Sequence, residues 1–326
     1  MISKVLLHEF ETILGKNNVF QDETDRMTYS YDAAVLEPAL PAIVLRPTSS
    51  GGLGQVVRLC NDHAIPLTVR GAGTNLSGGT IPKEGGAVVL TNALNRILEI
   101  NEEDLYAVVE PGVVTATFAA AVEARGLFYP PDPGSQAVST LGGNVAENAG
   151  GLRGLRYGVT RDYVMGLEFF DANGELIKAG ARTVKCVTGY NLGGLLVGSE
   201  GTLGVFSKII LKLIPMPSAK KAMIATFDDI NKASETVSAI ISNRIVPVTL
   251  EFMDQFTIRA VEDFSRVGLP ADAAALLLIE VDGHPVQVEE DAEKVESLCR
   301  KMGAMSIRIA RDAAERDRVW EARRAA

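Results

Sequence analysis

The clearest chemical signal in this sequence is a ten-residue loop, Arg70 to Gly79 (RGAGTNLSGG), which contains four glycines and three small polar residues. Residues without bulk let backbone N–H groups come close to an anion, and glycine adopts the positive φ angles that turn several N–H groups the same way. The loop therefore predicts a phosphate-binding site. A plain surface turn is the alternative that a glycine-rich loop alone leaves open.

Two common nucleotide motifs do not fit this loop. A dinucleotide fingerprint G-x-G-x-x-G needs glycine at position 76, where the chain has Leu76, and a Walker A loop needs lysine where the chain has Gly79. Without that lysine, nothing in the loop would reach the terminal phosphates of ATP. A diphosphate held mainly by backbone amides is therefore the favoured ligand.

The segments before the loop predict how it is positioned. Apolar residues Ala42–Leu45 and Pro66–Val69 read as buried strands, and Ser49 or Ser50 can cap a helix between them. This order predicts a small βαβ arrangement with the glycine loop at the carboxyl end of a strand, where open α/β sheets bind ligands.

The rest of the first two thirds of the chain reads as short elements with glycine turns. An amphipathic helix with Ser3 as its cap and Gly15 as its stop opens the chain, and Thr115 is expected to cap an alanine-rich helix. Asp171–Gly174 is expected to form a type I′ hairpin turn, because Asn-Gly suits that turn. Further strands are predicted at 87–90, 97–100, 106–109, 164–170 and 205–213.

The pattern of predicted elements changes after Pro215 and Pro217, so we place a domain boundary near Ser218. Strands and helices then alternate as in a ferredoxin-like α+β unit. Strands are predicted at 223–227, 248–253, 276–281 and 306–309, and helices at 230–243, 256–267 and 286–302. A last helix begins near Asp312 and reaches Ala326 without a stop signal, so we expect this domain to be truncated.

Composition excludes several classes of function. The 41 acidic and 32 basic residues leave a net charge of −9, which repels nucleic acid. No apolar run is as long as a membrane span, and charged residues near the N-terminus argue against a secretory signal, so a cytoplasmic protein is expected. The three cysteines and three histidines are scattered, and no local spacing predicts a metal site.

Four ordered motifs together resemble the FAD-binding domain of the vanillyl-alcohol oxidase or p-cresol methylhydroxylase type. They are the loop Arg70–Gly79, the Pro-Asp-Pro-Gly sequence Pro131–Gly134, the run Gly142–Gly151 (GGNVAENAGG) and the run Gly198–Gly204 (GSEGTLG). Within that family the chain looks most like the D subunit of bacterial glycolate oxidase and D-2-hydroxyacid (D-lactate) dehydrogenases. The stretches Leu250–Asp254 and Ala260–Phe264 contribute to this likeness.

The resemblance implies an α+β fold: a two-part FAD-binding domain of p-cresol methylhydroxylase type with an incomplete ferredoxin-like cap. The implied boundaries are 1–37 for an N-terminal helix and lead-in, 38–217 for the FAD-binding domain and 218–326 for a truncated cap or substrate domain. FAD is implied to be noncovalent, since the loop lacks the histidine to which some members attach flavin. The implied FAD-binding residues are Arg70, Gly71, Ala72, Gly73, Thr74, Asn75, Gly78, Gly79, Pro131, Asp132, Ser139, Gly142, Gly143, Asn148, Gly150, Glu200 and Val205.

The implied reaction is oxidation of a small 2-hydroxy acid to the 2-keto acid, with hydride passing to the flavin. Trp320-Glu321-Ala322-Arg323 matches a family pattern in which the arginine binds the substrate carboxylate, so Arg323 is the candidate, with a solvated arginine as the alternative. Full-length relatives also carry a histidine-containing divalent metal site, which this sequence lacks. Partner subunits or an electron carrier are implied as the route by which electrons leave.

Three other functions stay open at this point. A truncated, catalytically silent FAD-binding chain would explain the absent histidines. An NADPH-dependent flavin reductase of cell-wall precursor synthesis shares the loop type, although the run Gly198–Gly204 argues against it. A glycine-rich binding module without catalytic activity is the third.

Overall fold

The computed structural model describes residues 2–266, 268–310, 315 and 320, which form two compact units. The first unit comprises Met1–Gly150 and Val159–Pro215, and the second comprises Gly151–Gly158 and Met216–Ala326. The expected boundary near Ser218 lies close to the break after Pro215. Residues 151–158, which fall inside the expected FAD-binding domain, group with the second unit instead, and the lead-in 1–37 groups with the first.

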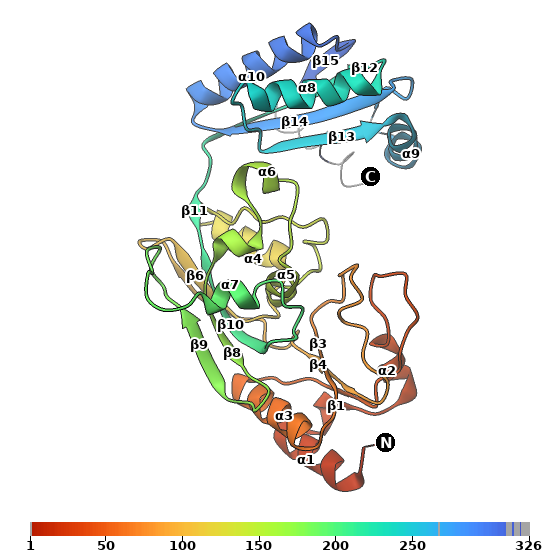
Figure 1. Ribbon diagram of the computed structural model, residues 1–326, viewed down its shortest axis with the longest axis vertical. Coiled ribbons are helices and arrows are strands. Elements are labelled where there is room, and N and C mark those ends of the chain that lie inside the picture. Colours follow the sequence, from red (N-terminus) through yellow and green to blue (C-terminus); the bar gives the residue numbers. More distant parts are fainter. Residues whose placement is uncertain (1, 267, 311–314, 316–319, 321–326) are drawn as a thin grey trace. The chain divides into compact units, whose positions relative to one another are not determined.

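The first sheet of the first unit carries the glycine loop (Figure 1). Its strands run in the order β1-β2-β4-β3, and both β2 and β3 pair with β4 in parallel. The expected βαβ unit is therefore present, but β4 lies between its two strands. Its elements are α1 (Lys4–Leu14), η1 (Lys16–Asn18), β1 (Val19–Phe20), α2 (Glu23–Thr28), β2 (Ile43–Leu45), α3 (Ser50–Asp62), β3 (Leu67–Arg70) and β4 (Ala87–Leu90).

Side-chain caps set the ends of the two long helices as the sequence predicts. The Ser3 hydroxyl accepts a hydrogen bond from the Leu6 N–H, and the Ser49 hydroxyl accepts one from the Gly52 N–H. Gly15 ends α1 with a φ of 79°. Both helices pack one apolar face on the sheet, in a core that includes Phe10, Leu14, Ile43, Leu45, Leu53, Val56, Val57, Ala87 and Val89.

A five-stranded antiparallel sheet forms the other half of the first unit, in the order β5-β6-β10-β8-β9. A two-stranded sheet pairs β7 with β11. The elements are β5 (Ile97–Asn101), β6 (Tyr106–Val109), α4 (Thr115–Glu123), β7 (Leu127–Phe128), α5 (Leu141–Glu147), η2 (Thr160–Tyr163), β8 (Val164–Phe170), β9 (Leu176–Gly180), α7 (Leu192–Leu196), β10 (Val205–Lys212) and β11 (Ile214–Pro215).

The hairpin between β8 and β9 is present, but its turn differs from the expected type I′. Positive φ occurs only at Gly174 (71°), whereas a type I′ turn also requires it at the preceding residue, Asn173. The Asp171 carboxylate accepts hydrogen bonds from the N–H groups of Asn173 (3.0 Å) and Glu175 (2.8 Å), which favours the observed turn.

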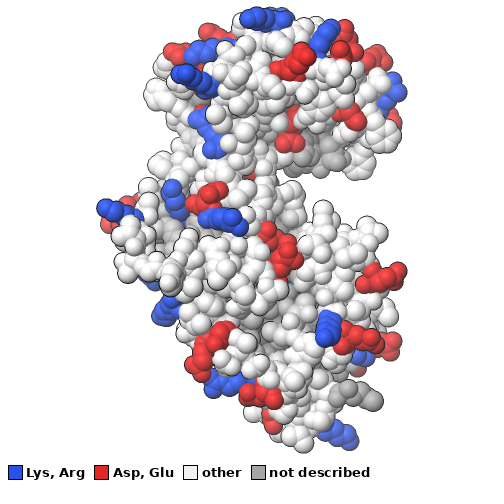
Figure 2. Space-filling view, viewed as in Figure 1, with Lys and Arg blue, Asp and Glu red and all other residues white. Residues whose placement is uncertain are grey.

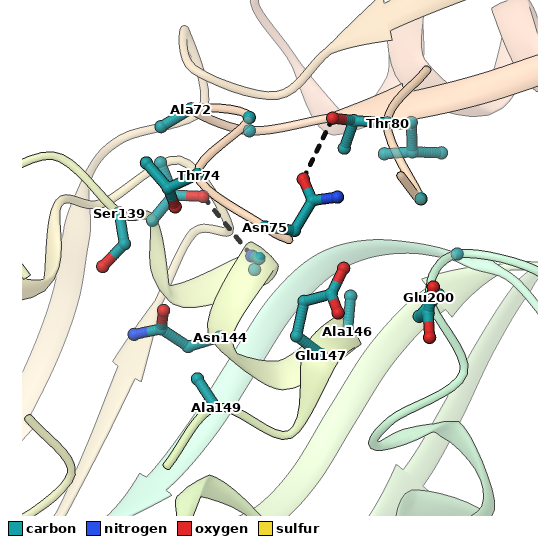
Figure 3. Close-up of a pocket in the computed structure, with 18 of the residues that line it drawn as sticks. Ala72, Thr74, Asn75, Thr80, Ser139, Asn144, Ala146, Glu147, Ala149 and Glu200 are labelled. Atoms are coloured by element: carbon teal, nitrogen blue, oxygen red, sulfur yellow. Dashed lines mark hydrogen bonds between the residues drawn. The ribbon is translucent and has the colours of Figure 1, made fainter. Parts of the chain in front are cut away.

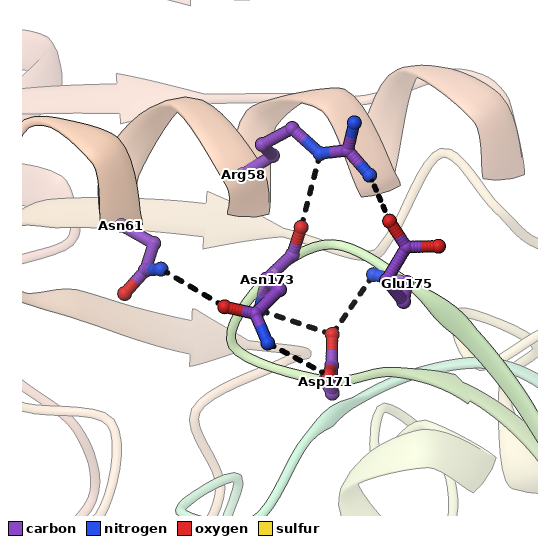
Figure 4. Close-up of polar contacts among 5 residues, drawn as sticks. All are labelled: Arg58, Asn61, Asp171, Asn173 and Glu175. Carbon is purple, nitrogen blue, oxygen red and sulfur yellow. Dashed lines mark hydrogen bonds and ion pairs between the residues drawn. The ribbon is translucent and has the colours of Figure 1, made fainter.

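Helix α3 joins the two sheets by docking on this turn (Figure 4). Arg58 Nε donates to the Asn173 carbonyl at 3.0 Å, and the same guanidinium forms an ion pair with Glu175. The backbones approach closely here, since a Cβ at Gly174 would lie 2.5 Å from the Gly54 carbonyl oxygen. This contact therefore links the sheet that contains β3 to the sheet that contains β8 and β10.

Two glycines of α3 should respond oppositely to alanine. A Cβ at Gly54 would lie 2.5 Å from the Phe170 ring, so Gly54→Ala should lower the free energy of unfolding by about 1–3 kcal/mol. Gly51 has nothing within 4 Å, so Gly51→Ala should raise it by up to about 1 kcal/mol through helix propensity. Urea unfolding of both variants measures the difference, and equal effects would contradict this packing.

The second unit has the strand order of a ferredoxin-like fold, which confirms that prediction. Its sheet runs β13-β14-β12-β15, and every neighbouring pair is antiparallel. The elements are α6 (Gly154–Tyr157), β12 (Ala219–Phe227), α8 (Ile230–Ser242), β13 (Thr249–Asp254), α9 (Gln255–Ser265), β14 (Ala275–Gly283), α10 (Pro285–Lys301) and β15 (Ser306–Ile309).

Helices cover both faces of this sheet, which explains its unbroken apolar strands. Side chains of α8 and α10 pack with Phe227, Leu277 and Ile279 on one face, and side chains of α9 pack with Leu276 and Leu278 on the other. All residues of β14 except its last are therefore buried.

Candidate functional site

A cavity of about 270 Å³ lies in the first unit where the glycine loop leaves β3 (Figure 3). The loop forms one wall, α5 another, and the segment before β10 a third. Ala72, Thr74 and Asn75 face α5 across it in Figure 3. The carboxyl end of β3 thus presents the loop to a cavity, as the sequence predicts.

The cavity brings together many, but not all, of the predicted site residues. Those that line it are Gly71, Ala72, Gly73, Thr74, Asn75, Gly79, Ser139, Gly142, Gly143 and Glu200. Those that do not are Arg70, Gly78, Pro131, Asp132, Asn148, Gly150 and Val205. Arg323 lies outside the described residues.

The loop offers a series of backbone donors to a ligand. Within the described part of the chain, no backbone N–H from Ala72 to Gly78 has a hydrogen-bond acceptor. Gly73 and Gly78 have φ angles of 71° and 80°, conformations that glycine adopts without strain. Successive free N–H groups in such a loop favour a bound anion, as the diphosphate of a dinucleotide would supply.

Close backbone approach explains why glycine follows β3 directly. A Cβ at Gly71 would lie only 2.3 Å from Thr140 Oγ1. That hydroxyl caps α5 by accepting a hydrogen bond from the Gly143 N–H at 3.3 Å. Any larger residue at 71 would therefore push the loop away from α5, the wall it faces.

Arg70 supports the loop from outside the cavity. Its side chain is buried over the Tyr29 ring, at 5.7 Å from the ring centre, and its Nη1 donates to the Tyr31 carbonyl at 2.6 Å. Burial lowers the pKa of the guanidinium, and the Asp32 carboxylate opposes that shift. The contact between Arg70 and the ligand, which the resemblance implies, stays a prediction.

A buried hydroxyl network places Ser139 and Asn144 at the cavity. Thr115 Oγ1 lies 2.9 Å from Ser139 Oγ and accepts a hydrogen bond from Asn144 Nδ2 at 2.8 Å. The expectation that Thr115 caps α4 is wrong, because Val114 holds the cap position and the Thr115 hydroxyl is engaged in this network. Its buried partners lie 24 and 29 residues away, so no local pattern reveals it.

Two carboxylates approach the end of the loop. A Cβ at Gly79 would lie 2.9 Å from Glu200 Oε2 and 3.4 Å from Glu147 Oε1. Burial, followed by the charge of Glu200, raises the pKa of Glu147, and a hydrogen bond from Ser77 opposes that rise. These acceptors suit the hydroxyl groups of a sugar or ribityl chain better than a phosphate.

Replacing Glu147 should stabilise the protein without FAD in a pH-dependent way. A carboxyl whose pKa rises on folding costs stability once the pH exceeds its ordinary value, 4.5 for glutamate. Glu147→Gln should therefore raise the free energy of unfolding at neutral pH, by less than about 1 kcal/mol because the group is partly exposed. The gain should shrink as the pH falls toward the ordinary value and should be absent below it.

Thermal unfolding across pH measures this effect. Glu84→Gln, at an exposed position, is the matched control and should show no such gain. A gain at Glu147 that is equally large at acidic pH would contradict the account.

Several lining residues were not predicted from sequence. They are Val69, Leu76, Thr80, Thr91, Pro111, Ser135, Thr140, Asn144, Ala146, Glu147, Ala149, Gly201, Gly204 and Phe206. Many lie inside or next to the recognised motifs, as Glu147 does in GGNVAENAGG. Their position in a motif could therefore have identified them from the sequence. Pro111 and Thr91 carried none.

The second unit contains a buried ionic cluster. Asp282, with a side chain 1% exposed, accepts a hydrogen bond from Tyr157 Oη at 2.7 Å and lies 3.2 Å from Arg156 Nε. Trp320 Nε1 donates a hydrogen bond to Glu280 Oε2 at 2.6 Å. Glu280 lies two residues before Asp282 on β14. These contacts fasten the segment 151–158 and Trp320 to β14.

Other kinds of site find little support in the described residues. Among them, no group of three or more His, Cys, Asp and Glu side chains could hold a metal ion. No helix formed by these residues has the length and apolar character needed to cross a membrane. Figure 2 shows acidic and basic side chains interspersed over the visible face, with no broad basic surface among the residues it describes.

Comparison with known proteins identifies the class. The family description "FAD binding domain" matches residues 41–180, and "FAD linked oxidases, C-terminal domain" matches residues 216–326. A solved structure of p-cresol methylhydroxylase superposes with a TM-score of 0.83 at 20% identity, covering 98% of this chain and 71% of that one. That likeness shows the fold, and it confirms the predicted FAD-binding domain of p-cresol methylhydroxylase type.

Sequence relatives define the family more narrowly. Glycolate oxidase subunit GlcD of Bacillus subtilis (strain 168) is 48% identical over all of this chain and 69% of its own length. GlcD of Escherichia coli (strain K12) is 38% identical over 99% of this chain and 64% of its own length, so the chain spans about two thirds of these relatives. D-lactate dehydrogenase of Anaerostipes hadrus is 33% identical over 99% and 69%. The chain belongs to this family of FAD-linked oxidoreductases, as the motifs predicted.

Proposed function

We propose that this chain provides the FAD-binding and cap domains of an enzyme that oxidises a small 2-hydroxy acid, of the glycolate or D-lactate type, to the 2-keto acid. The observation that carries the proposal is the series of backbone N–H groups from Ala72 to Gly78 without protein acceptors, beside a cavity in an FAD-binding domain. The names of the relatives, glycolate oxidase subunit and D-lactate dehydrogenase, support the substrate class.

The residues around the cavity have distinct proposed tasks. Backbone N–H groups of Ala72–Gly78 bind the diphosphate, and the carboxylates of Glu147 and Glu200 accept hydrogen bonds from hydroxyl groups of the cofactor. Ser139, Gly142 and Gly143 leave room for it along α5. Bound FAD supplies the acceptor for the hydride that leaves the α-carbon.

The substrate side of the proposal rests on the resemblance. Arg323 is proposed to bind the substrate carboxylate. A planar guanidinium can form two parallel hydrogen bonds with the two oxygens of a carboxylate. The described residues offer no group of three or more His, Cys, Asp or Glu side chains for the metal that the resemblance implies in relatives. Because two relatives are named as subunits, a partner subunit or carrier is proposed to take the electrons onward.

Anaerobic mixing tests the reaction. The FAD-loaded protein should lose its flavin absorbance on addition of glycolate or D-lactate, and it should keep it with buffer alone. Bleaching by NADPH but not by a 2-hydroxy acid would favour the flavin reductase and contradict the proposal. Bound flavin that none of these compounds bleaches would leave a catalytically silent FAD-binding chain as the better account.

A further inference from the structure

The segment Tyr31–Leu36 lies against the glycine loop, although the sequence placed it in an irregular lead-in. The Ala33 N–H donates to the Gly73 carbonyl at 3.1 Å, and a Cβ at Gly78 would lie 2.6 Å from Leu36 Cδ1. In the middle of the segment, Asp32 is only 7% exposed. A buried carboxylate behind a loop that is expected to bind a diphosphate requires a physical explanation.

Among the described residues, Asp32 accepts hydrogen bonds from Asn75 of the glycine loop, from Thr80 directly after it and from Ala34 in its own segment. Its Oδ2 accepts hydrogen bonds from Asn75 Nδ2 at 2.8 Å, Thr80 Oγ1 at 3.1 Å and the Thr80 N–H at 3.3 Å. Its Oδ1 accepts one from the Ala34 N–H at 2.9 Å. An ionised carboxylate, which only accepts, is the side chain that can satisfy this many donors at once.

Asp32 interacts electrostatically with charged groups on β3 and on α5. The Arg70 guanidinium at the end of β3 is attracted to it, and Tyr29 and Tyr31 flank that guanidinium. Glu147, on α5, is repelled by it. Electrostatics alone would thus predict that a negative charge at position 32 weakens the binding of an anion to the loop.

The geometry predicts the opposite. Asp32 Oδ2 accepts hydrogen bonds from the Asn75 amide and from the hydroxyl and N–H of Thr80, on the side of the loop that contacts the segment Tyr31–Leu36. The Thr80 hydroxyl also lies 3.0 Å from Asn75 Oδ1, so its single hydrogen is shared between Asn75 and Asp32. With these polar groups engaged, the N–H groups of Ala72–Gly78 are the donors that remain for a ligand.

We propose that Asp32 is a positioning residue for the cofactor: it holds the glycine loop in the conformation that binds the FAD diphosphate, without touching FAD itself. This inference rests on the proposed cofactor site. Asparagine at 32 would keep the shape but replace one acceptor oxygen with a donor that faces other donors. The loop should then lose its fixed conformation despite the more favourable charge.

Titration of the FAD-free protein with FAD, followed by flavin fluorescence quenching, tests the proposal. Asp32→Asn should raise the Kd about tenfold, as expected when one or two charge-assisted hydrogen bonds no longer stabilise the binding conformation. Glu37→Gln removes the same charge from the exposed position directly after this segment and should leave the Kd within about twofold of the wild-type value.

The titration is run below the melting temperature of each FAD-free protein, so global unfolding cannot account for a change in the Kd. An unchanged or lower Kd for Asp32→Asn would overturn the proposal, the lower value showing that charge repulsion dominates. Should that variant fail to fold, Thr80→Val, which removes one donor to Asp32, decides: about threefold weaker binding supports the proposal, and an unchanged Kd overturns it. Failure of the wild-type protein to bind FAD would instead contradict the proposed function.

Discussion

Gly71→Ala should strongly weaken FAD binding. The new Cβ would lie 2.3 Å from Thr140 Oγ1, so the loop and the start of α5 must separate. Overpacking of this kind costs about 1–3 kcal/mol. Because the displaced walls are those of the cavity, the cost should appear as a Kd raised by about ten- to a hundredfold.

Fluorescence titration with FAD measures this change, and Gly134→Ala is its control. Gly134 belongs to the Pro-Asp-Pro-Gly sequence, but a Cβ there would have nothing within 4 Å. The control should bind FAD as the wild-type protein does. If both variants bind equally well, the loop and α5 do not form the two sides of the cofactor site.

Arg156→Ala should strongly destabilise the second unit. The substitution would leave the Asp282 carboxylate, 1% exposed, without its cationic partner. Removing one member of a buried ion pair costs about 3–5 kcal/mol, and the hydrogen bond from Tyr157 places the expected value at the lower end. The free energy of unfolding should therefore fall by about 3 kcal/mol.

The fluorescence of Trp320, the single tryptophan, reports on this unit during urea unfolding, because its side chain packs on the α9 side of the sheet. Arg300→Ala is the matched control. Arg300 pairs with Glu296 on the surface of α10, where such a pair contributes less than about 0.5 kcal/mol. A loss at Arg156 no larger than at Arg300 would show that Asp282 gains nothing from the ion pair.

Regular elements and their order could be predicted because their signals are local. Apolar periodicity gave the helices of the second unit to within a few residues, and β4, β6, β8 and β15 have the bounds that were expected. Serine caps at Ser3 and Ser49 set helix starts through neighbouring N–H groups. The glycine motifs identified the family. Their glycines lie where the backbone closely approaches other groups, as at Gly71.

Contacts between distant residues could not be predicted in this way. Strand pairing places β4 between β2 and β3. The contacts of Arg156 and Tyr157 with Asp282 explain why residues 151–158 group with the second unit. Asp32 lies 43 residues from Asn75. A lone aspartate in an irregular segment has no periodicity or spacing that distinguishes it from a solvated one.

The same limit explains why the predicted capping role of Thr115 was wrong. Thr115 stands at a plausible cap position, and only the folded chain brings the Ser139 and Asn144 side chains to its hydroxyl. Arg70 begins a motif whose glycines line the cavity, yet its own side chain is directed to Tyr31. Motif membership predicts the neighbourhood of a residue better than the direction of its side chain.

Hydrogen exchange of the backbone amides, with and without FAD, is the most direct test of the central claim. Peptides that cover Ala72–Gly78 should exchange rapidly in the FAD-free protein, because these N–H groups have no acceptor in the described part of the chain, and slowly once FAD is bound. Saturating FAD that leaves their exchange unchanged, while protecting another segment, would show that the diphosphate is held elsewhere.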